Sequence, residues 1–242
     1  MKNLSNRKID ERNFWNRVVT EGELQKPFRS PWESYHWEKI FQTLTSLYDF
    51  GEKRVFVGGC GTGIFEEWLL RSYSVKKIVG MDISEKMVEL AMQRCREFRE
   101  VEFISGDMDA TGYPAGFFDV CVIIDALHHM PDEHSSLKEM SRIGKNLILS
   151  EPNALNPIRR LNERKFRGQE VTERSFHKLK LRNILRELGY QKIVVRNCHF
   201  IPSFVPPRLV RVLRTIDTIM ERVPLFKEIS GSLNFVCLRE GG

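Results

Sequence analysis

The residues with the clearest chemistry stand together in one stretch, from Arg54 to Gly63. A short apolar run leads directly into Gly59, Gly61 and Gly63, and a helical pattern of apolar residues begins at Ile64. Glycine permits positive φ and lets the backbone approach a ligand closely, while the start of a helix presents free N–H groups and the positive end of its dipole. A strand, a glycine turn and a helix in this order predict a binding site for a nucleotide-like molecule.

The spacing of the glycines and the next carboxylate narrow the choice of ligand. The pattern G-x-G-x-G differs from the G-x-G-x-x-G of dinucleotide sites, and no Gly-Lys-Ser/Thr ending marks a phosphate-binding P-loop. A second apolar run ends at Asp82, 19 residues after Gly63, close to the roughly 20 expected before an acidic side chain that accepts the ribose hydroxyls. A turn that only lets a helix cross a strand closely is the alternative. The loop and the carboxylate together favour an adenosine site, and a nicotinamide dehydrogenase is the least favoured use of it.

Four motifs resemble those of class I S-adenosylmethionine-dependent methyltransferases, in the same order and with the same spacing. They are Val-Gly-Gly-Cys-Gly-Thr-Gly (57–63), Gly-Met-Asp-Ile-Ser-Glu-Lys-Met (80–87), Ser-Gly-Asp-Met (105–108) and Phe-Asp-Val-Cys-Val-Ile-Ile-Asp-Ala-Leu-His-His (118–129). The resemblance covers residues 40–150 well and residues 150–240 in outline. It implies a Rossmann-like fold and S-adenosyl-L-methionine as the cofactor.

The resemblance also implies which residues surround that cofactor. The glycine loop would approach the methionine moiety, and the following strand ends would hold the ribose and the adenine; the residues are Gly59, Cys60, Gly61, Gly63, Asp82, Ile83, Asp107 and Met108. Most relatives carry an acidic residue where this chain has Val57, and that residue helps to hold the ammonium group of the cofactor. Asp125 is the expected substitute, and weaker cofactor binding is the other outcome.

A pair of histidines, His128 and His129, follows the fourth predicted strand. Imidazole titrates near neutral pH, so either residue is a candidate base for removing a proton from a hydroxyl acceptor. Adjacent side chains diverge, and we therefore expect only one of the two in the pocket, with the other packing or capping the next helix. Methyl transfer without a base is the alternative.

A metal site is the less favoured interpretation of the same region. Asp125, Glu151 and Asn153 end neighbouring strands and offer the oxygen ligands that Mg²⁺ prefers. The surrounding residues do not otherwise match metal-dependent methyltransferases, and we expect no metal. The Asn/Asp-Pro-Pro-Tyr signature of enzymes that methylate the amino groups of nucleic acid bases is also absent after the fourth strand.

The periodicity predicts an α/β fold with a Rossmann-like, seven-stranded, mostly parallel, doubly wound sheet and helices on both faces. We expect strands at 54–57, 77–82, 101–104, 119–124, 146–150, 190–196 and 233–238, and helices at 9–19, 32–48, 64–72, 84–98, 134–143 and 175–188. Two prolines after Ser150 are expected to end the fifth strand. The chain divides into an N-terminal helical lid (1–50), a cofactor-binding core (51–151) and a C-terminal half of the sheet with helical insertions (152–242), within one domain overall.

Two insertions in the C-terminal half bear on possible partners. Residues 158–186 contain ten lysines and arginines against three glutamates, which suits either a solvated surface or an anionic partner. Residues 201–224 form an amphipathic pattern whose apolar face is expected to pack on the body or on a second subunit, rather than on a membrane.

Composition excludes an integral membrane protein, because no apolar run approaches the roughly 18 residues of a spanning helix. The N-terminus shows no apolar signal segment, so we expect a cytoplasmic protein with five buried, free cysteines. The leading hypothesis is methyl transfer to an oxygen of a small or lipid-like molecule, with peripheral membrane contact as an option. An RNA methyltransferase that uses the basic region and a catalytically silent interaction protein remain alternatives, and the oligomeric state stays open.

Overall fold

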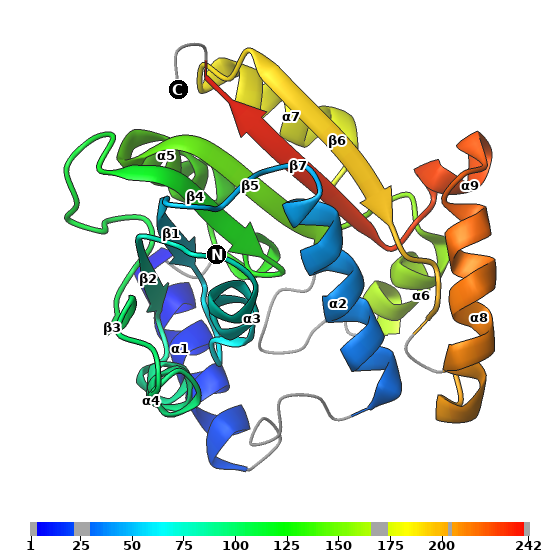
Figure 1. Cartoon of the computed structure of the whole chain (residues 1–242), viewed down its shortest axis with the longest axis horizontal. Coiled ribbons are helices and arrows are strands. Elements are labelled where there is room, and N and C mark those ends of the chain that lie inside the picture. Colours follow the sequence, from blue (N-terminus) through cyan, green and yellow to red (C-terminus); the bar gives the residue numbers. More distant parts are fainter. Residues whose placement is uncertain (1–3, 22–29, 166–173, 203–204, 240–242) are drawn as a thin grey trace.

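A computed structural model describes residues 4–21, 30–165, 174–202 and 205–239 of the chain. Its centre is one seven-stranded sheet in the order β3-β2-β1-β4-β5-β7-β6 (Figure 1). The strands are β1 (Arg54–Gly58), β2 (Lys77–Asp82), β3 (Val101–Ser105), β4 (Phe118–Ile124), β5 (Gly144–Pro152), β6 (Lys192–Cys198) and β7 (Ser232–Leu238). Only β7 runs against its neighbours, so the predicted mostly parallel sheet is confirmed.

Helices surround this sheet and match most of the predicted segments. They are α1 (Leu4–Thr20), α2 (Pro31–Thr45), α3 (Ile64–Ser72), α4 (Glu85–Arg94), η1 (Leu127–His129), α5 (Glu133–Ile143), α6 (Pro157–Lys165), α7 (Lys178–Glu187), α8 (Pro207–Met220) and α9 (Pro224–Glu228). Side-chain hydrogen bonds fix where two of these helices begin. Ser30 is the N-cap of α2 and Ser84 is the N-cap of α4, and each side chain accepts a hydrogen bond from a backbone N–H of its helix. Pro31 occupies the first turn of α2, where its missing N–H has no cost.

Two apolar layers hold the sheet between the helices. Alternate strand residues face opposite sides, so Val55 and Val57 pack with α2, α3 and α4, whereas Phe56 packs with α5 and α7. Strand β4 is buried almost throughout, which explains its unbroken apolar run. The five cysteines are buried and free, as predicted. Helices therefore cover both faces, in agreement with the doubly wound prediction.

The structure corrects the predicted end of the fifth strand. Strand β5 does not stop at Ser150 but continues to Pro152, which pairs with Ser232 of β7. Antiparallel pairing with β7 extends β5 beyond Ser150. The carbonyl of Pro152 also accepts a hydrogen bond from the backbone N–H of Phe176. The extra residues place Glu151 and Pro152 beside the carboxyl end of β4.

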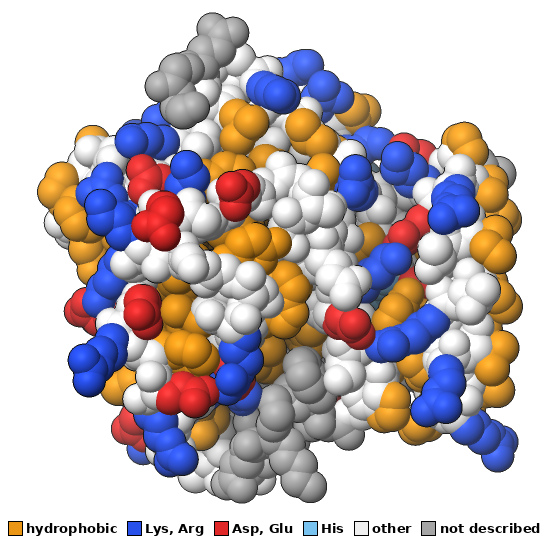
Figure 2. Space-filling view, viewed as in Figure 1, with side chains coloured by type: hydrophobic (Ala, Val, Ile, Leu, Met, Phe, Trp, Pro, Cys, Tyr) orange, Lys and Arg blue, Asp and Glu red, His pale blue; other side chains and the backbone are white. Residues whose placement is uncertain are grey.

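The amphipathic helix α8 does not pack most of its apolar stripe on the body of the protein. It contacts α2 through Val210 and a buried Asp217, which accepts the Tyr35 hydroxyl and the backbone N–H of Phe200. Most of the predicted apolar stripe is exposed and does not pack on the body, whereas its packing on a second subunit stays a prediction; the exposed residues are Leu209, Val212, Ile216, Ile219 and Val223. Figure 2 shows apolar side chains along the edge where Figure 1 places α8. Because the Tyr35–Asp217 contact decides the rotation of the helix, its apolar stripe faces outward.

In the part of the chain that the structure describes, no helix is long and apolar enough to cross a membrane.

Candidate active site

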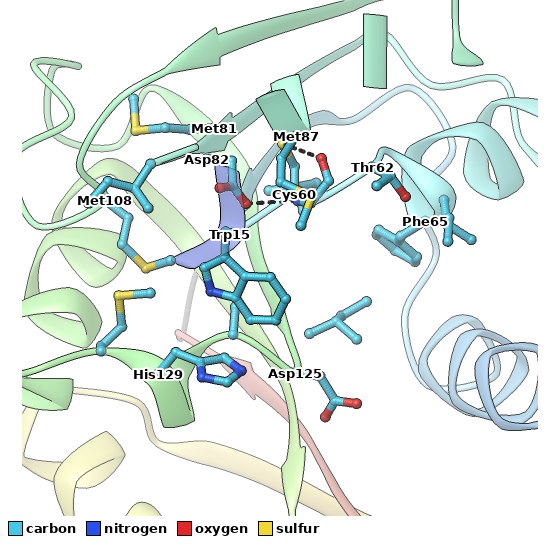
Figure 3. Close-up of a pocket in the computed structure, with 18 of the residues that line it drawn as sticks. Trp15, Cys60, Thr62, Phe65, Met81, Asp82, Met87, Met108, Asp125 and His129 are labelled. Carbon is cyan, nitrogen blue, oxygen red and sulfur yellow. Dashed lines mark hydrogen bonds between the residues drawn. The ribbon is translucent and has the colours of Figure 1, made fainter. Parts of the chain in front are cut away.

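A cavity of about 270 Å³ opens at the carboxyl ends of the first four strands of the chain (Figure 3). This is the edge where an open α/β sheet binds its ligands, next to the β1/β4 switch point. Nine of the eleven predicted cofactor and catalytic residues line the cavity: Gly59, Cys60, Gly61, Asp82, Ile83, Asp107, Met108, Asp125 and His129. Gly63 and His128 lie outside the lining.

The glycine turn after β1 needs glycine for conformation and for space. Gly59 and Gly61 have φ of 69° and 52°, in the left-handed region that favours glycine. A Cβ on Gly59 would lie 2.4 Å from the Cβ of Ala126, whereas a Cβ on Gly61 would meet no atom within 4 Å. The turn therefore packs closely on the β4 side and leaves open space at Gly61.

Gly63 has a different place in the same turn. It is the N-cap of α3, with φ of 74°, and a Cβ there would lie 3.0 Å from the Cβ of Ala91 on α4. Its role in this structure is to begin α3 and to let α3 and α4 approach closely.

Asp82 fastens the glycine turn to the end of β2. One carboxylate oxygen accepts the backbone N–H of Gly61 at 2.9 Å, and the other accepts that of Ser84 at 2.9 Å. Burial raises the pKa of Asp82 from its ordinary value, against the lowering effect of these backbone hydrogen bonds. A carboxylate oxygen can accept more than one hydrogen bond, so Asp82 retains capacity for a ligand hydroxyl.

Helix α1 covers the cavity near the end of β3. Lys8 of α1 forms ion pairs with Asp107 at 2.6 Å and with Asp109 at 2.5 Å. Farther along the helix, Asn16 accepts a hydrogen bond from the Ser84 hydroxyl, which ties α1 to the start of α4. Lys8, Glu11 and Trp15 consequently line the cavity. The amphipathic pattern of α1 indicated a helix, but nothing in the sequence linked Lys8 to residues about a hundred positions away.

The two histidines diverge, although their rings lie 4.0 Å apart. His129 lines the cavity and meets the indole of Trp15 edge-on at 5.2 Å (Figure 3). Its Nδ1 is buried and has no hydrogen-bond partner among the described residues. Burial, and next the neighbouring His128, hold the pKa of His129 well below its usual range. His129 is therefore neutral near pH 7, and its lowered pKa makes it a weaker base than an ordinary histidine.

His128 turns away from the cavity toward Glu151. Its Nδ1 lies 2.8 Å from one oxygen of Glu151, and the other oxygen accepts the backbone N–H groups of Ala126 and Leu127. Asp125, His128 and Glu151 offer ligand atoms that lie within 4.8 Å of one another. Asn153 does not join them, because its amide donates to the carbonyls of Glu228 and Ser230 and accepts from Leu155. These hydrogen bonds give Glu151 and Asn153 a structural role at the strand ends.

A buried carboxyl group that the sequence did not single out lies in the same cavity wall. Glu66, in the first turn of α3, is fully buried, and neither of its oxygens has a hydrogen-bond partner in the described structure. Burial raises the pKa of Glu66 to about 8. In the sequence it is one of two adjacent glutamates at a helix start, where acidic residues are common, so no signal marked it.

A second cavity of about 290 Å³ adjoins the first, and three residues line both: Glu33, Trp37 and Asp125. Asp125 accepts a hydrogen bond from His36 of α2 at 3.2 Å, and His36 lies 2.8 Å from His199, which follows β6. The hydrogen bond from His36 is the main influence that holds the pKa of Asp125 below its usual range, despite the opposing effect of burial. Neither histidine was predicted, since they stand 163 positions apart in unrelated patterns.

Comparison with known proteins supports the family resemblance. Residues 57–146 match a methyltransferase domain model. The chain is 36% identical over 89 residues to the demethylmenaquinone methyltransferase of Lactococcus lactis, 29% over 105 residues to the malonyl-[acyl-carrier protein] O-methyltransferase of Legionella pneumophila, and 34% over 113 residues to the ubiquinone biosynthesis O-methyltransferase of Methylococcus capsulatus. These alignments cover 36%, 43% and 44% of this chain, and 35%, 37% and 44% of the relatives, so the chain matches less than half of each relative's length.

Solved structures extend the similarity across almost the whole fold. A chain from the complex of the Trm112 methyltransferase activator of Haloferax volcanii with a methyltransferase superposes with a TM-score of 0.69 at 18% identity, covering 93% of this chain and 96% of that one. A SAM-dependent methyltransferase of Thermotoga maritima superposes with a TM-score of 0.65 at 20% identity, covering 95% and 99%. Residues 57–146 are therefore similar to a methyltransferase domain, and the chain shares the fold of the solved S-adenosylmethionine-dependent methyltransferase structures.

Proposed function

We propose that the protein transfers the methyl group of S-adenosyl-L-methionine to an oxygen of a small or lipid-like molecule. The observation that carries the proposal is the convergence of the motif residues on one cavity at the switch point of the sheet. When bound, the cofactor supplies a methyl group on a positively charged sulfur. The protein's part is then to align the acceptor and, for a hydroxyl, to receive its proton.

The residues around the cavity fit this cofactor. Gly59 and Gly61 let the backbone approach a ligand, and Gly61 faces open space. Asp82 would bind the ribose, Ile83 would lie against the adenine, and Asp107 with Met108 would contact the edge of its ring. In that case Asp107 divides its hydrogen bonds between the ligand and Lys8. Helices α1 and α2 would act as the lid over the two cavities.

The missing acidic residue at Val57 has two candidate replacements in the structure. Asp125 and Glu66 both line the cofactor cavity, and each has at least one buried oxygen without a partner in the described part of the chain. Asp125 would complement an ammonium group as a carboxylate, and Glu66 would do so once the incoming positive charge lowers its raised pKa. Measuring cofactor affinity in Asp125→Asn and in Glu66→Gln distinguishes them.

The relatives and one exposed surface support a lipid-like acceptor. Two of the relatives are, by name, a demethylmenaquinone methyltransferase and a ubiquinone biosynthesis O-methyltransferase. The outward stripe of α8 is apolar, and Arg208, Arg211 and Arg222 are exposed on the same helix and its end. An apolar stripe beside arginines is typical of a helix that lies on an anionic membrane surface. Peripheral contact of this kind would bring the protein to an acceptor that resides in a membrane.

The alternative of an RNA substrate receives less support. Residues 166–173 of the basic region lie outside the described residues. In the described part, Arg174 and Lys180 form ion pairs with Glu133, and Lys178 pairs with Glu228. Lysines and arginines that already form ion pairs attract the phosphates of RNA less than unpaired ones do.

The function is tested by calorimetry and by turnover. S-adenosylhomocysteine should bind to the purified protein, whereas NAD should not. Methyl transfer from labelled S-adenosylmethionine should label the solvent-extracted lipid fraction of cells. Binding of the cofactor product without transfer to any lipid or aqueous extract would instead indicate a silent cofactor-binding protein.

A further inference from the structure

We propose that the second cavity is the methyl-acceptor site, and that it takes a flat, apolar molecule whose hydroxyl donates a hydrogen bond to Asp125. This inference rests on the proposed function and names the substrate class for it. The two cavities share Asp125, Trp37 and Glu33, so a molecule in the second cavity meets the first at Asp125. That junction is where an acceptor atom must lie for an in-line transfer.

The backbone and side chain of Asp125 are both unusual. Its φ is 46°, a left-handed conformation that non-glycine residues rarely adopt, and such residues cluster at functional sites. The Oδ2 atom accepts a hydrogen bond from His36, and Oδ1 is buried without a hydrogen-bond partner in the described structure. Since buried carboxylate oxygens are normally paired, Oδ1 is an acceptor held ready for a ligand.

The histidines behind Asp125 decide which hydrogen bonds the cavity offers. Because Asp125 accepts from Nε2 of His36, the neutral form of His36 carries its proton there, and its Nδ1 accepts from Nε2 of His199. His199 also has a left-handed φ, of 51°, and its Nδ1 is buried without a partner among the described residues. The chain from Asp125 to His199 thus presents acceptors at both ends, and His36 is a positioning residue between them.

The charge of Asp125 excludes one class of acceptor. Its hydrogen bond with His36 keeps the carboxylate ionised at neutral pH. A hydroxyl can donate to an ionised carboxylate, whereas an incoming carboxylate would meet a like charge at close range. At Asp125 the site therefore favours a hydroxyl over a carboxylate, and Arg159 is the cation of the same lining that a carboxylate would have to reach instead.

The remaining walls suit a flat apolar body. Trp32, Trp37, Ile158, Ile201 and Pro202 line the second cavity. The indole N–H of Trp32 donates to the carbonyl of Ile201 at 2.6 Å, and its ring stacks on His36 at 4.9 Å. Because these contacts fix the tryptophan, its position is defined before a ligand enters. The same lining also holds the polar side chains of Glu33, Asn156, Arg159 and Ser232. Aromatic walls combined with a few placed polar groups are typical of sites for ring-shaped ligands.

A matched pair of ligands tests the inference. We would measure binding of 2-naphthol and of 2-naphthoate by calorimetry to the full chain saturated with S-adenosylhomocysteine. The wild type should bind 2-naphthol at least roughly tenfold more tightly than 2-naphthoate. Asp125→Asn should remove most of this preference, His36→Gln should weaken it, and the exposed His134→Gln should leave it unchanged. Thermal unfolding of each variant would show that the fold is retained.

The outcomes separate this inference from the proposed function. Failure of S-adenosylhomocysteine to bind the wild type would contradict the proposed function itself. Binding of S-adenosylhomocysteine with no binding of 2-naphthol, or with equal binding of 2-naphthoate, would overturn the acceptor site alone. A loss of S-adenosylhomocysteine affinity in Asp125→Asn that equals or exceeds its loss of 2-naphthol affinity would also overturn it, because Asp125 would then serve the cofactor.

Discussion

His36 Nε2 lies 3.2 Å from Asp125 Oδ2, although the two residues come from a helix before the sheet and from the end of its central strand β4. This hydrogen bond joins α2 to the point where the two cavities meet. The N-terminal helices therefore do more than cover the sheet, since one of them holds a carboxylate of the site in place.

His128→Ala should lower the free energy of unfolding, and its effect should not be confined to the rate of methyl transfer. The substitution removes the hydrogen-bond partner of Glu151, a carboxyl group with no exposed surface. Leaving a buried carboxyl group without its partner costs about 3 kcal/mol of the free energy of unfolding. Urea denaturation of His128→Ala measures this loss, with His134→Ala as a surface control. Equal midpoints for the two variants would contradict the structural role of His128.

His129→Ala tests whether a histidine in the cofactor cavity acts as the base. If it does, turnover should fall by roughly a hundredfold while affinity for S-adenosylhomocysteine changes little, because the loss is confined to the transition state. The pKa of His129 lies well below its usual range, so wild-type turnover should not rise with pH between about 6.5 and 8 on account of this residue. Turnover close to that of the wild type would assign the proton to another acceptor or to solvent.

Much of the first cavity, the proposed cofactor site, was predictable because local patterns encode it. The glycine turn, Asp82 and the strand ends at 105–108 and 125 each follow an apolar strand directly, and parallel strands bring their ends to one edge. Ser30 and Ser84, the N-caps of α2 and α4, likewise stand directly before their helices in the sequence.

The second cavity was not predictable in the same way. His36, Asp125 and His199 meet only after α2, β4 and the segment after β6 have packed, and no local pattern marks such a contact. That the apolar stripe of α8 does not pack on the body could not be predicted for a related reason. Buried contacts of Val210 and Asp217 with Tyr35, rather than the apolar periodicity of the helix, face the body.

Glu66→Gln should change how the stability of the ligand-free protein depends on pH. Glu66 has a pKa of about 8 in the folded state and about 4.3 when unfolded, so between these values the folded state binds more protons. Stability must then fall as pH rises, by at most about 1.4 kcal/mol per pH unit. Glu66→Gln should lack this component of the slope. Urea denaturation between about pH 5.5 and 8 measures it, with exposed Glu100→Gln as the control. Parallel slopes for Glu66→Gln and wild type would refute the buried, protonated Glu66.

Ile216→Glu combined with Ile219→Glu tests the outward stripe of α8. Wild-type protein should co-sediment with vesicles of phosphatidylglycerol and phosphatidylcholine at low salt, and less so at high salt or with phosphatidylcholine alone. The double variant should bind at least roughly tenfold more weakly, because two charges enter the apolar stripe. Met92→Glu with Leu179→Glu adds the same charge at exposed apolar sites elsewhere and should bind as the wild type does. Equal loss in both double variants would show that charge alone, and not this stripe, decides binding.

The cofactor site is tested most directly by titrating S-adenosylhomocysteine into wild type and Asp82→Ala. Asp82 is buried in the cavity wall and holds the glycine turn through Gly61, and it is the proposed partner of the ribose hydroxyls. Loss of these charge-assisted hydrogen bonds should weaken binding by about 2 kcal/mol, or roughly thirtyfold. We expect the wild type to bind S-adenosylhomocysteine, and we expect Asp82→Ala to remain folded and to bind it more weakly by this amount. Unchanged affinity in Asp82→Ala, or no binding to the wild type, would contradict the account.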